Sequence, residues 1–277
     1  MKIEERYAID PEGFISYDTS RIRKEFVVNP LFIKNDISVV YSHYDRFIIG
    51  GIMPDKKLLL ESFDLLKASY FLERREMGII NVGGKGSVIA DGYEFELNFK
   101  DALYLGKATK EISFSSSDIS NPAKFYFNSA PAHHAYPSKL IRFDDAEKVI
   151  LGSMETDNHR QLNKLIVNST VQTCQLQMGL TELKTGSVWN TMPAHIHSRR
   201  METYFYFNLP ADQAVCHFMG QPQETRHVWL GNEQAVISPP WSVHSGAGTS
   251  SYSFIWGMAG ENLDYGDMDV CPINQLK

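Results

Sequence analysis

From about residue 70 onward, the chain is a succession of short runs in which β-branched and aromatic residues alternate with polar ones. Gly, Asn and Pro separate these runs, of which "KEISFSSS", "TYFYFNL" and "YSFIWGMAG" are examples. A period of two over a few residues predicts a strand, and many such strands in succession are typical of sandwiches and barrels. We therefore expect an all-β protein with a few short helices.

The strand-like runs form two groups, roughly at 70–130 and 170–260, separated by the stretch "NSAPAHHAYPSKLIRFDDAEK". Each group is long enough for one small barrel, so we expect two similar barrels in tandem, at 1–148 and 149–277. Helical periodicity is confined to "DKKLLLESFDLLKAS" and, more weakly, to "DDAEKVILGSMETDNHRQLNKLI". These segments predict short helices, although loop and strand remain an alternative for the first.

Composition narrows the classes of partner. The chain has 277 residues, of which 43% are hydrophobic, and 27 Lys and Arg against 33 Asp and Glu give a net charge of −6. No basic patch in the sequence suggests binding to nucleic acid or to an anionic membrane, so the expected partner is a small molecule. The first residues, "MKIEERYAID", carry charges in place of an apolar signal core, and we expect a cytoplasmic protein. Three cysteines without metal-type spacing are expected to be ordinary buried thiols, at Cys174, Cys216 and Cys271.

A candidate metal site lies in the stretch "PAHIHSRRMETYFYF". His195 and His197 are one residue apart, and alternate side chains of a strand point to the same face. Glu202 has the opposite parity, so a turn at 198–200 is needed to point it at the same centre. Beyond that turn, Glu202, Tyr204 and Tyr206 share a face, and they are expected to line the barrel interior.

A third histidine is expected from a strand further along the chain. The segment "GNEQAVISPPWSVHSGAG" offers His244 just after a Pro-Pro corner, which holds the backbone extended. The resulting set is His195, His197, Glu202 and His244. Three imidazoles and a carboxylate suit Zn²⁺, and also Mn²⁺, Fe²⁺, Ni²⁺ or Co²⁺ when positions stay open for water or substrate.

Two stretches, from Gly186 to Pro210 and from Gly231 to His244, resemble the two metal-binding motifs of the cupin superfamily. The sequence departs from the motifs in detail: Leu209 and Pro210 stand where the first commonly closes with Gly, and Trp241 replaces a common Gly of the second. No departure removes a ligand. The resemblance implies two jelly-roll-like cupin barrels, an arrangement called a bicupin.

Nearly the whole chain is also similar to one bicupin family, the 4-deoxy-L-threo-5-hexosulose-uronate ketol-isomerases, or 5-keto-4-deoxyuronate isomerases. The similar stretches are "EERYAIDPEGFISYDTSRIRKEF", "PAHIHSRRMETYFYFNLP" and "WLGNEQAVISPPWSVHSGAGTSSYSFIWGMAGEN". The resemblance implies a zinc enzyme of pectin breakdown, a homo-hexamer with one metal per subunit, held in the C-terminal barrel alone. The family's ligand pattern falls on the same four residues. The N-terminal stretch "GGKGSVIADGYEFEL" has no histidine, which agrees with a barrel without metal.

The reaction that the resemblance implies converts 5-dehydro-4-deoxy-D-glucuronate to 3-deoxy-D-glycero-2,5-hexodiulosonate by moving a carbonyl from C1 to C2. A divalent cation would stabilise the enediolate oxygens, and a general base must carry the proton. Glu202, Tyr204, Tyr206 or a metal-bound hydroxide could serve as this base. For the substrate carboxylate, a guanidinium is the natural partner, and the candidates are Arg160, Arg199 and Arg200.

Other functions remain open at this point. A related isomerase acts on 5-deoxyglucuronate in inositol breakdown. Three histidines and a glutamate can also hold iron or copper, so an oxygen-dependent cupin dioxygenase is a second class of enzyme. A sugar- or metal-binding bicupin without catalysis is a third hypothesis, which the full set of ligands makes less favoured.

Overall fold

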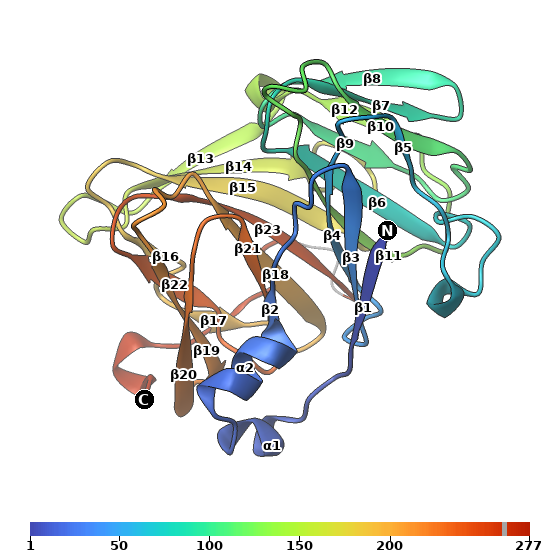
Figure 1. Cartoon of the computed structure of the whole chain (residues 1–277). Coiled ribbons are helices and arrows are strands. Elements are labelled where there is room, and N and C mark those ends of the chain that lie inside the picture. Colours follow the sequence, from blue (N-terminus) through green and yellow to red (C-terminus); the bar gives the residue numbers. More distant parts are fainter. Residues whose placement is uncertain (262–264) are drawn as a thin grey trace. The chain divides into compact units, whose positions relative to one another are not determined.

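The computed structural model describes residues 1–261 and 265–277, and Figure 1 shows these as strands with a few short helices. The all-β prediction is confirmed. The chain divides into two compact units: the first comprises residues 1–6, 30–147 and 165–178, and the second comprises 7–29, 148–164 and 179–277. No helix of the described residues is long and apolar enough to cross a membrane.

The first unit is built on a seven-stranded sheet of order β1-β3-β4-β11-β6-β9-β12 and a four-stranded sheet of order β5-β10-β7-β8. β1 pairs parallel with β3, and the neighbours from β3 to β12 in this sheet pair antiparallel. The elements are β1 (Lys2–Arg6), β3 (Asp36–Ser42), β4 (Ile48–Met53), β5 (Leu58–Leu59), η1 (Asp64–Leu66), β6 (Arg75–Asn81), β7 (Gly86–Ala90), β8 (Tyr93–Leu97), β9 (Ala102–Leu105), β10 (Ile112–Ser116), β11 (Phe125–Pro131), β12 (Lys139–Ile141) and η2 (Phe143–Asp145).

The second unit repeats this plan, with a seven-stranded sheet of order β13-β14-β15-β23-β18-β21-β2, a four-stranded sheet of order β16-β22-β19-β20, and the pair β17-β24. The elements are α1 (Pro11–Ile15), α2 (Thr19–Phe26), β2 (Val27–Val28), β13 (Glu147–Leu151), β14 (Arg160–Ile166), β15 (Gln177–Leu183), β16 (Trp189–Asn190), β17 (His195–Ile196), β18 (Arg200–Phe207), β19 (Val215–Gln221), β20 (Glu224–Leu230), β21 (Gln234–Ser238), β22 (Ser245–Gly248), β23 (Ser253–Gly260), β24 (Asp269–Val270) and η3 (Ile273–Gln275).

The two larger sheets correspond strand by strand, so β6 of the first unit is the counterpart of β18 of the second. β6 begins at Arg75, opposite Pro131 at the end of β11, and β18 begins at Arg200, opposite Gly260 at the end of β23. Two residues along, Met77 of β6 stands where β18 has Glu202. Met77 belongs to the apolar core of the first unit, so this barrel lacks the carboxylate of the predicted metal site.

The core of the first unit follows from the period of two. In β7 the burial alternates strictly, so Gly86, Val88 and Ala90 face inward. Val88 lies in one cluster with buried side chains from the larger sheet, among them Ile79 and Phe127. Burying such side chains contributes about 1.5–3 kcal/mol each, so this cluster holds the two sheets of the unit together.

The two helices belong to the second unit, where α1 contacts β19 and α2 contacts β20 and β21 (Figure 1). Asp10 and Asp18 cap them, accepting hydrogen bonds from the backbone N–H groups of Gly13 and Arg21, each three residues further along the chain. Phe14 and Phe26 are buried and pack around Trp241, at ring-centroid distances of 5.2 and 6.5 Å. The tryptophan that departs from the cupin motif therefore anchors the N-terminal helices.

The helices predicted at 55–69 and 144–166 are wrong. The first segment contains β5 and the single turn η1, and the second contains most of η2 and all of β13 and β14. Leu58 and Leu59 pair with β10, and partly buried Leu66 packs on the core of the first unit. Pairing with a neighbouring strand therefore overrides the local helical periodicity.

Each unit is assembled from separate stretches of the chain. The chain passes from the first unit to the second between Glu147 and Lys148, next to the predicted boundary, but residues 7–29 and 165–178 lie with the other half of the sequence. Glu76 explains why residues 165–178 belong to the first unit. Its buried carboxylate accepts hydrogen bonds of 2.8 Å from the backbone N–H groups of residues 174, 175 and 176.

Candidate metal centre

Two short elements and a turn bring the predicted ligands together. His195 lies in β17, Ser198 and Arg199 form a turn, and Glu202 follows in β18, so the turn required by the parity of the sequence is present. His244 directly precedes β22. The four side chains converge, and their candidate ligand atoms all lie within 4.8 Å of one another.

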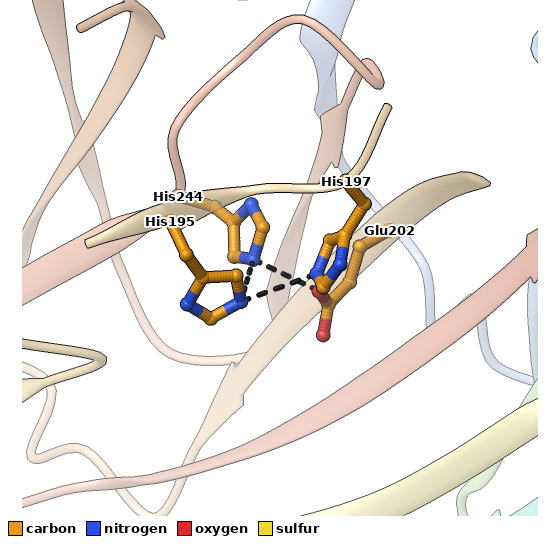
Figure 2. A group of neighbouring side chains, drawn as sticks. All are labelled: His195, His197, Glu202 and His244. Atoms are coloured by element: carbon orange, nitrogen blue, oxygen red, sulfur yellow. Dashed lines mark hydrogen bonds and ion pairs between the residues drawn. The ribbon is translucent and has the colours of Figure 1, made fainter. Parts of the chain in front are cut away.

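Figure 2 shows three imidazole rings and the carboxylate turned toward one point. The Nε2 atom of His195 lies 3.1 Å from Nε2 of His197 and 3.0 Å from Nε2 of His244. Oε2 of Glu202 lies 3.0 Å from Nε2 of His197 and 2.9 Å from Nε2 of His244. Atoms about 2.1 Å from a shared ion are roughly 3.0 Å apart at right angles and roughly 3.4 Å apart at tetrahedral angles. The spacing fits one central cation.

The environment favours the protonation states that ligands need. Burial, with the neighbouring charge of His244, lowers the pKa of His195 to about 2, so its ring is neutral near pH 7. Burial alone would raise the pKa of Glu202, but the charge of His244 and hydrogen bonds from His197 and His244 outweigh it and hold that pKa well below its usual range. A neutral imidazole and an ionised carboxylate are the ligand forms of these groups.

The ring of His197 is oriented from behind by a backbone carbonyl. Its Nδ1 lies 2.7 Å from the carbonyl oxygen of Asp267 and 3.2 Å from Nε of Arg200. A proton on Nδ1 satisfies the shorter contact, because a carbonyl only accepts, and this tautomer is the one that would turn the lone pair of Nε2 toward a bound cation. Arg200, buried beneath the site, donates to the carbonyl oxygens of Tyr265 at 3.1 Å and Asp267 at 3.0 Å. The guanidinium thus holds the segment that orients His197.

A cavity of about 370 Å³ opens onto His195, His197 and Glu202, and its volume is within the range of small-molecule sites. Apolar residues form much of its wall. Its polar lining, besides the cluster, comprises Arg160, Lys164, Thr181, Thr191, Arg200, Tyr204 and Tyr265.

The two tyrosines predicted beside Glu202 have different surroundings. Tyr204 lines the cavity, and its hydroxyl lies 2.8 Å from Oγ1 of Thr191. Tyr206 is not part of the cavity lining, and its hydroxyl lies 2.8 Å from Nδ1 of His217, a buried residue of β19. Burial and the charge of Glu202 raise the pKa of Tyr204 well above its usual value, so Tyr204 is a neutral phenol that can donate a proton.

The three arginines predicted to bind the substrate carboxylate differ in their position relative to the cavity. Arg160 lines the cavity and donates to the carbonyl oxygen of Asn158 at 2.9 Å. Arg200 lines it too, but two of its hydrogen bonds go to the backbone of residues 265 and 267. Arg199 lies in the exposed turn, outside the lining, with its Nε 3.7 Å from Glu261.

Sequence reasoning missed several polar groups of the cavity, among them Lys164 and Trp256. Lys164 shares a face of β14 with Arg160 and Leu162, and all three line the cavity, so the alternation of this strand could have indicated it. Trp256, on β23, also lines the cavity, and its buried indole Nε1–H has no hydrogen-bond partner in residues 1–261 and 265–277. No local pattern marks this indole, because its position depends on strand pairing.

Comparison with known proteins places this site in a family. Residues 30–270 match the model of the KduI/IolB family. The chain belongs to the KduI/IolB family. The predicted relationship is therefore confirmed, and the matched range includes all four clustered residues.

Curated relatives cover the full length of the chain. The chain is 60% identical over 277 residues to a 4-deoxy-L-threo-5-hexosulose-uronate ketol-isomerase of Formosa agariphila, covering 100% of this chain and 99% of the relative. It is 57% identical to ketol-isomerase 1 of the same name from Bacteroides thetaiotaomicron, covering 99% and 98%.

Solved structures show the cupin fold. An IolB-like protein of Salmonella typhimurium superposes with a TM-score of 0.67 at 18% identity, over 81% of this chain and 86% of that one. The oxalate decarboxylase of Bacillus subtilis, a protein with Mn(II) centres, superposes with a TM-score of 0.56 at 9% identity, over 80% and 71%. At these identities the likeness concerns the fold alone, and the predicted cupin architecture is confirmed.

Proposed function

We propose that the protein is a metal-dependent ketol-isomerase that converts 5-dehydro-4-deoxy-D-glucuronate to 3-deoxy-D-glycero-2,5-hexodiulosonate. The observation that carries the proposal is the buried set of three histidines and one glutamate at a cavity that also exposes cationic side chains. Relatives 52–60% identical to this chain over nearly its full length bear the name of this isomerase. His195, His197, Glu202 and His244 would hold the cation.

A divalent cation bound there supplies a Lewis acid that polarises the substrate carbonyl and favours negative charge on its oxygen. The residues of the chain must then move two protons. One leaves C2 and returns to C1, and the other leaves the hydroxyl on C2 and reaches the oxygen on C1. The product is a ketose with the same atoms as the substrate.

Tyr204 is suited to the second transfer. Its phenol is neutral, lies on the cavity wall and contacts the hydroxyl of Thr191, so the pair can pass a proton between neighbouring oxygens. Glu202 lines the cavity and turns Oε2 to His197 and His244, so this oxygen would hold the cation while the other, Oε1, is proposed as the base at C2. Tyr206 would act through His217, because its hydroxyl is turned to that ring.

Arg160 is proposed to bind the substrate carboxylate, with Lys164 beside it on β14. A guanidinium fork matches a carboxylate in two hydrogen bonds, whereas an ammonium acts as a point charge. Arg200 would support the site by holding the backbone at residues 265–267, and Arg199 would act from the rim.

The native cation is proposed to be Zn²⁺, one per subunit, with Mn²⁺, Fe²⁺, Ni²⁺ or Co²⁺ as alternatives that the same ligands accept. From the resemblance to the ketol-isomerase family, we also propose that the protein is a cytoplasmic homo-hexamer that acts on uronates from pectin. Elemental analysis of protein purified without added metal tests the first proposal. Sedimentation of the same sample tests the second.

The test of the activity is anaerobic incubation of metal-loaded protein with the 4-deoxy-5-ketouronate in D₂O, followed by proton NMR. Conversion to the 2,5-diketo acid without oxygen is expected, together with its loss in the variant His195→Ala. Solvent deuterium at C1 of the product would show that the carried proton exchanges. No conversion by folded, metal-loaded protein would contradict the proposal.

The same NMR assay, repeated with 5-deoxyglucuronate and repeated in the presence of oxygen, discriminates the neighbouring hypotheses. Turnover of 5-deoxyglucuronate in place of the 4-deoxy-5-ketouronate would indicate the isomerase of inositol breakdown, the chemistry nearest to this one. Turnover that requires oxygen would indicate a cupin dioxygenase.

A further inference from the structure

The first unit has a basic cavity of its own. It lies where β6 begins, which corresponds to the start of β18 beside the candidate metal site in the second unit. Its volume is about 370 Å³. Four of its lining residues are cationic, none is acidic, and the cations are Arg46, Lys67, Arg74 and Arg75. Tyr41, Phe71 and aliphatic side chains supply the rest of the wall.

Arg75 is the fixed element of this cavity. It begins β6, as Arg200 begins β18, and it shares a strand face with Met77 and Ile79 of the core. Its side chain is buried, with 6% exposure for the residue. Nε donates to Oγ of Ser129 at 3.1 Å, and Nη2 donates to the carbonyl oxygens of Arg46 at 2.6 Å and Ser129 at 2.8 Å.

All of these partners are neutral. No carboxylate pairs with Arg75 among residues 1–261 and 265–277. The adjacent carboxylate of Glu76 lies on the opposite strand face and already accepts the hydroxyl of Tyr104 and three backbone N–H groups. Burial, with the nearby charge of Arg46, lowers the pKa of Arg75 to about 9, although the neighbouring Tyr41 and Glu76 oppose this shift.

The other cations come from two loops beside it. Arg46 and Arg74 are exposed, and neither has a carboxylate partner in the part of the chain that the structure describes. Arg74 donates instead to the carbonyl oxygens of Leu66 and Lys67, which keeps its guanidinium near the cavity. Lys67 contacts exposed Asp64 at 2.5 Å, so that pair contributes less net charge.

A buried guanidinium without a counter-ion is costly. Nε and Nη2 of Arg75 already donate to neutral partners, so an anion would accept from the N–H groups of Nη1 and remove part of that cost through charge. We propose that this cavity binds a small organic anion, a sugar acid or a sugar phosphate. Arg75 receives the carboxylate or phosphate at the inner end, and Arg46 and Arg74 close on it from the rim. Phe71 and the aliphatic wall accept the carbon skeleton. The site is separate from the metal cluster and does not depend on the proposed isomerase activity.

The test is calorimetric titration of the full-length, metal-loaded protein with inorganic phosphate and, separately, with D-glucuronate. Binding of either probe at one site of the first unit is expected to persist in His195→Ala, which isolates it from the metal centre. The variants Arg46→Gln and Arg74→Gln are expected to weaken it by about tenfold each, the effect of one hydrogen bond to a charged group. Lys110→Gln, an exposed cation of the same unit outside the cavity, is the matched control.

The outcomes are decisive because Arg46 and Arg74 are exposed and their variants are expected to keep the fold, which thermal unfolding checks. Phosphate alone binding would identify a phosphorylated ligand, and glucuronate alone would identify a sugar acid. Absence of saturable binding of both probes up to about 10 mM would overturn the proposal. So would binding that Arg46→Gln and Arg74→Gln leave unchanged. Conversely, a failed isomerase assay would leave this titration unaffected.

Discussion

At the scale of single residues, Tyr204 and Tyr206 are a natural matched pair. Both are buried on the same strand face, but only Tyr204 lines the cavity. If the Tyr204 phenol moves a proton, Tyr204→Phe should lower kcat by about 10²–10⁴-fold, the usual contribution of acid–base catalysis. Tyr206→Phe should change kcat far less. Steady-state kinetics of both variants at equal metal content checks this, and equal losses would argue against a specific role of Tyr204.

Arg160 allows a second test at this scale. Arg160→Lys keeps the charge but loses the planar fork, so the KM for the ketouronate should rise by roughly tenfold or more while metal content stays the same. A substrate analogue without the carboxylate should bind both proteins equally. If KM is unchanged in Arg160→Lys, the carboxylate lies elsewhere in the cavity.

The candidate metal ligands at 195–202 could be predicted from the sequence because their arrangement depends on local geometry. The spacing of His195 and His197 and the parity of Glu202 are properties of a strand and a turn, whichever fold surrounds them. The indole of Trp256 and the Tyr206–His217 contact depend on pairing between strands far apart in the chain, so no local pattern indicates them.

At the scale of elements, the end of the chain is tied to the metal site. β17 pairs with β24, with His195 opposite Val270, and Arg200 binds the carbonyl oxygens at residues 265 and 267. Truncating Arg200 should therefore release the segment that orients His197. This connection makes Arg200 a positioning residue for the proposed site.

We expect Arg200→Met to lower metal affinity by about 10–100-fold, as is typical when the partner of a ligand is lost. Backbone amides of residues 265–270 should exchange faster with solvent in this variant. The neighbouring Arg199→Met, in the exposed turn, serves as the control and should leave both quantities unchanged. Metal competition with a chelator and hydrogen exchange measure the two effects, and unchanged exchange in Arg200→Met would refute the link.

The elements themselves were predicted unevenly. Strands followed from alternation, whereas the predicted helix at 55–69 gave way to strand pairing with β10. The assignment of residues 7–29 and 165–178 to the unit formed mainly by the other half of the sequence could not be predicted from local sequence patterns. Residues 174–176 are held by Glu76, which lies about a hundred residues earlier in the chain, and Trp241 receives the helix side chains of Phe14 and Phe26.

At the scale of the whole molecule, buried histidines should make stability depend on pH. Burial lowers the pKa of His217 to about 3, below the value of about 6.5 expected in the unfolded chain. Between these values the unfolded state binds more protons, so the free energy of unfolding rises with pH and is lost as pH falls from about 6.5. In metal-free protein, His217→Gln should reduce the slope of unfolding free energy against pH by up to about 1.4 kcal/mol per pH unit. Urea titrations between pH 6 and 4 test this, and identical slopes would contradict it.

A bound cation should stabilise the whole fold, because the four ligands come together only in the native state. At a free metal concentration 100 times Kd, the gain in unfolding free energy is about 2.7 kcal/mol. Chelation should therefore lower Tm by roughly 5–10 °C for a chain of this size, and added Zn²⁺ should restore it. Glu202→Gln, which leaves the cluster without its carboxylate, should have a low Tm that chelation does not change. A Tm of the wild-type protein that is insensitive to chelator, in a sample shown to contain metal, would mean that the ion is bound outside this cluster.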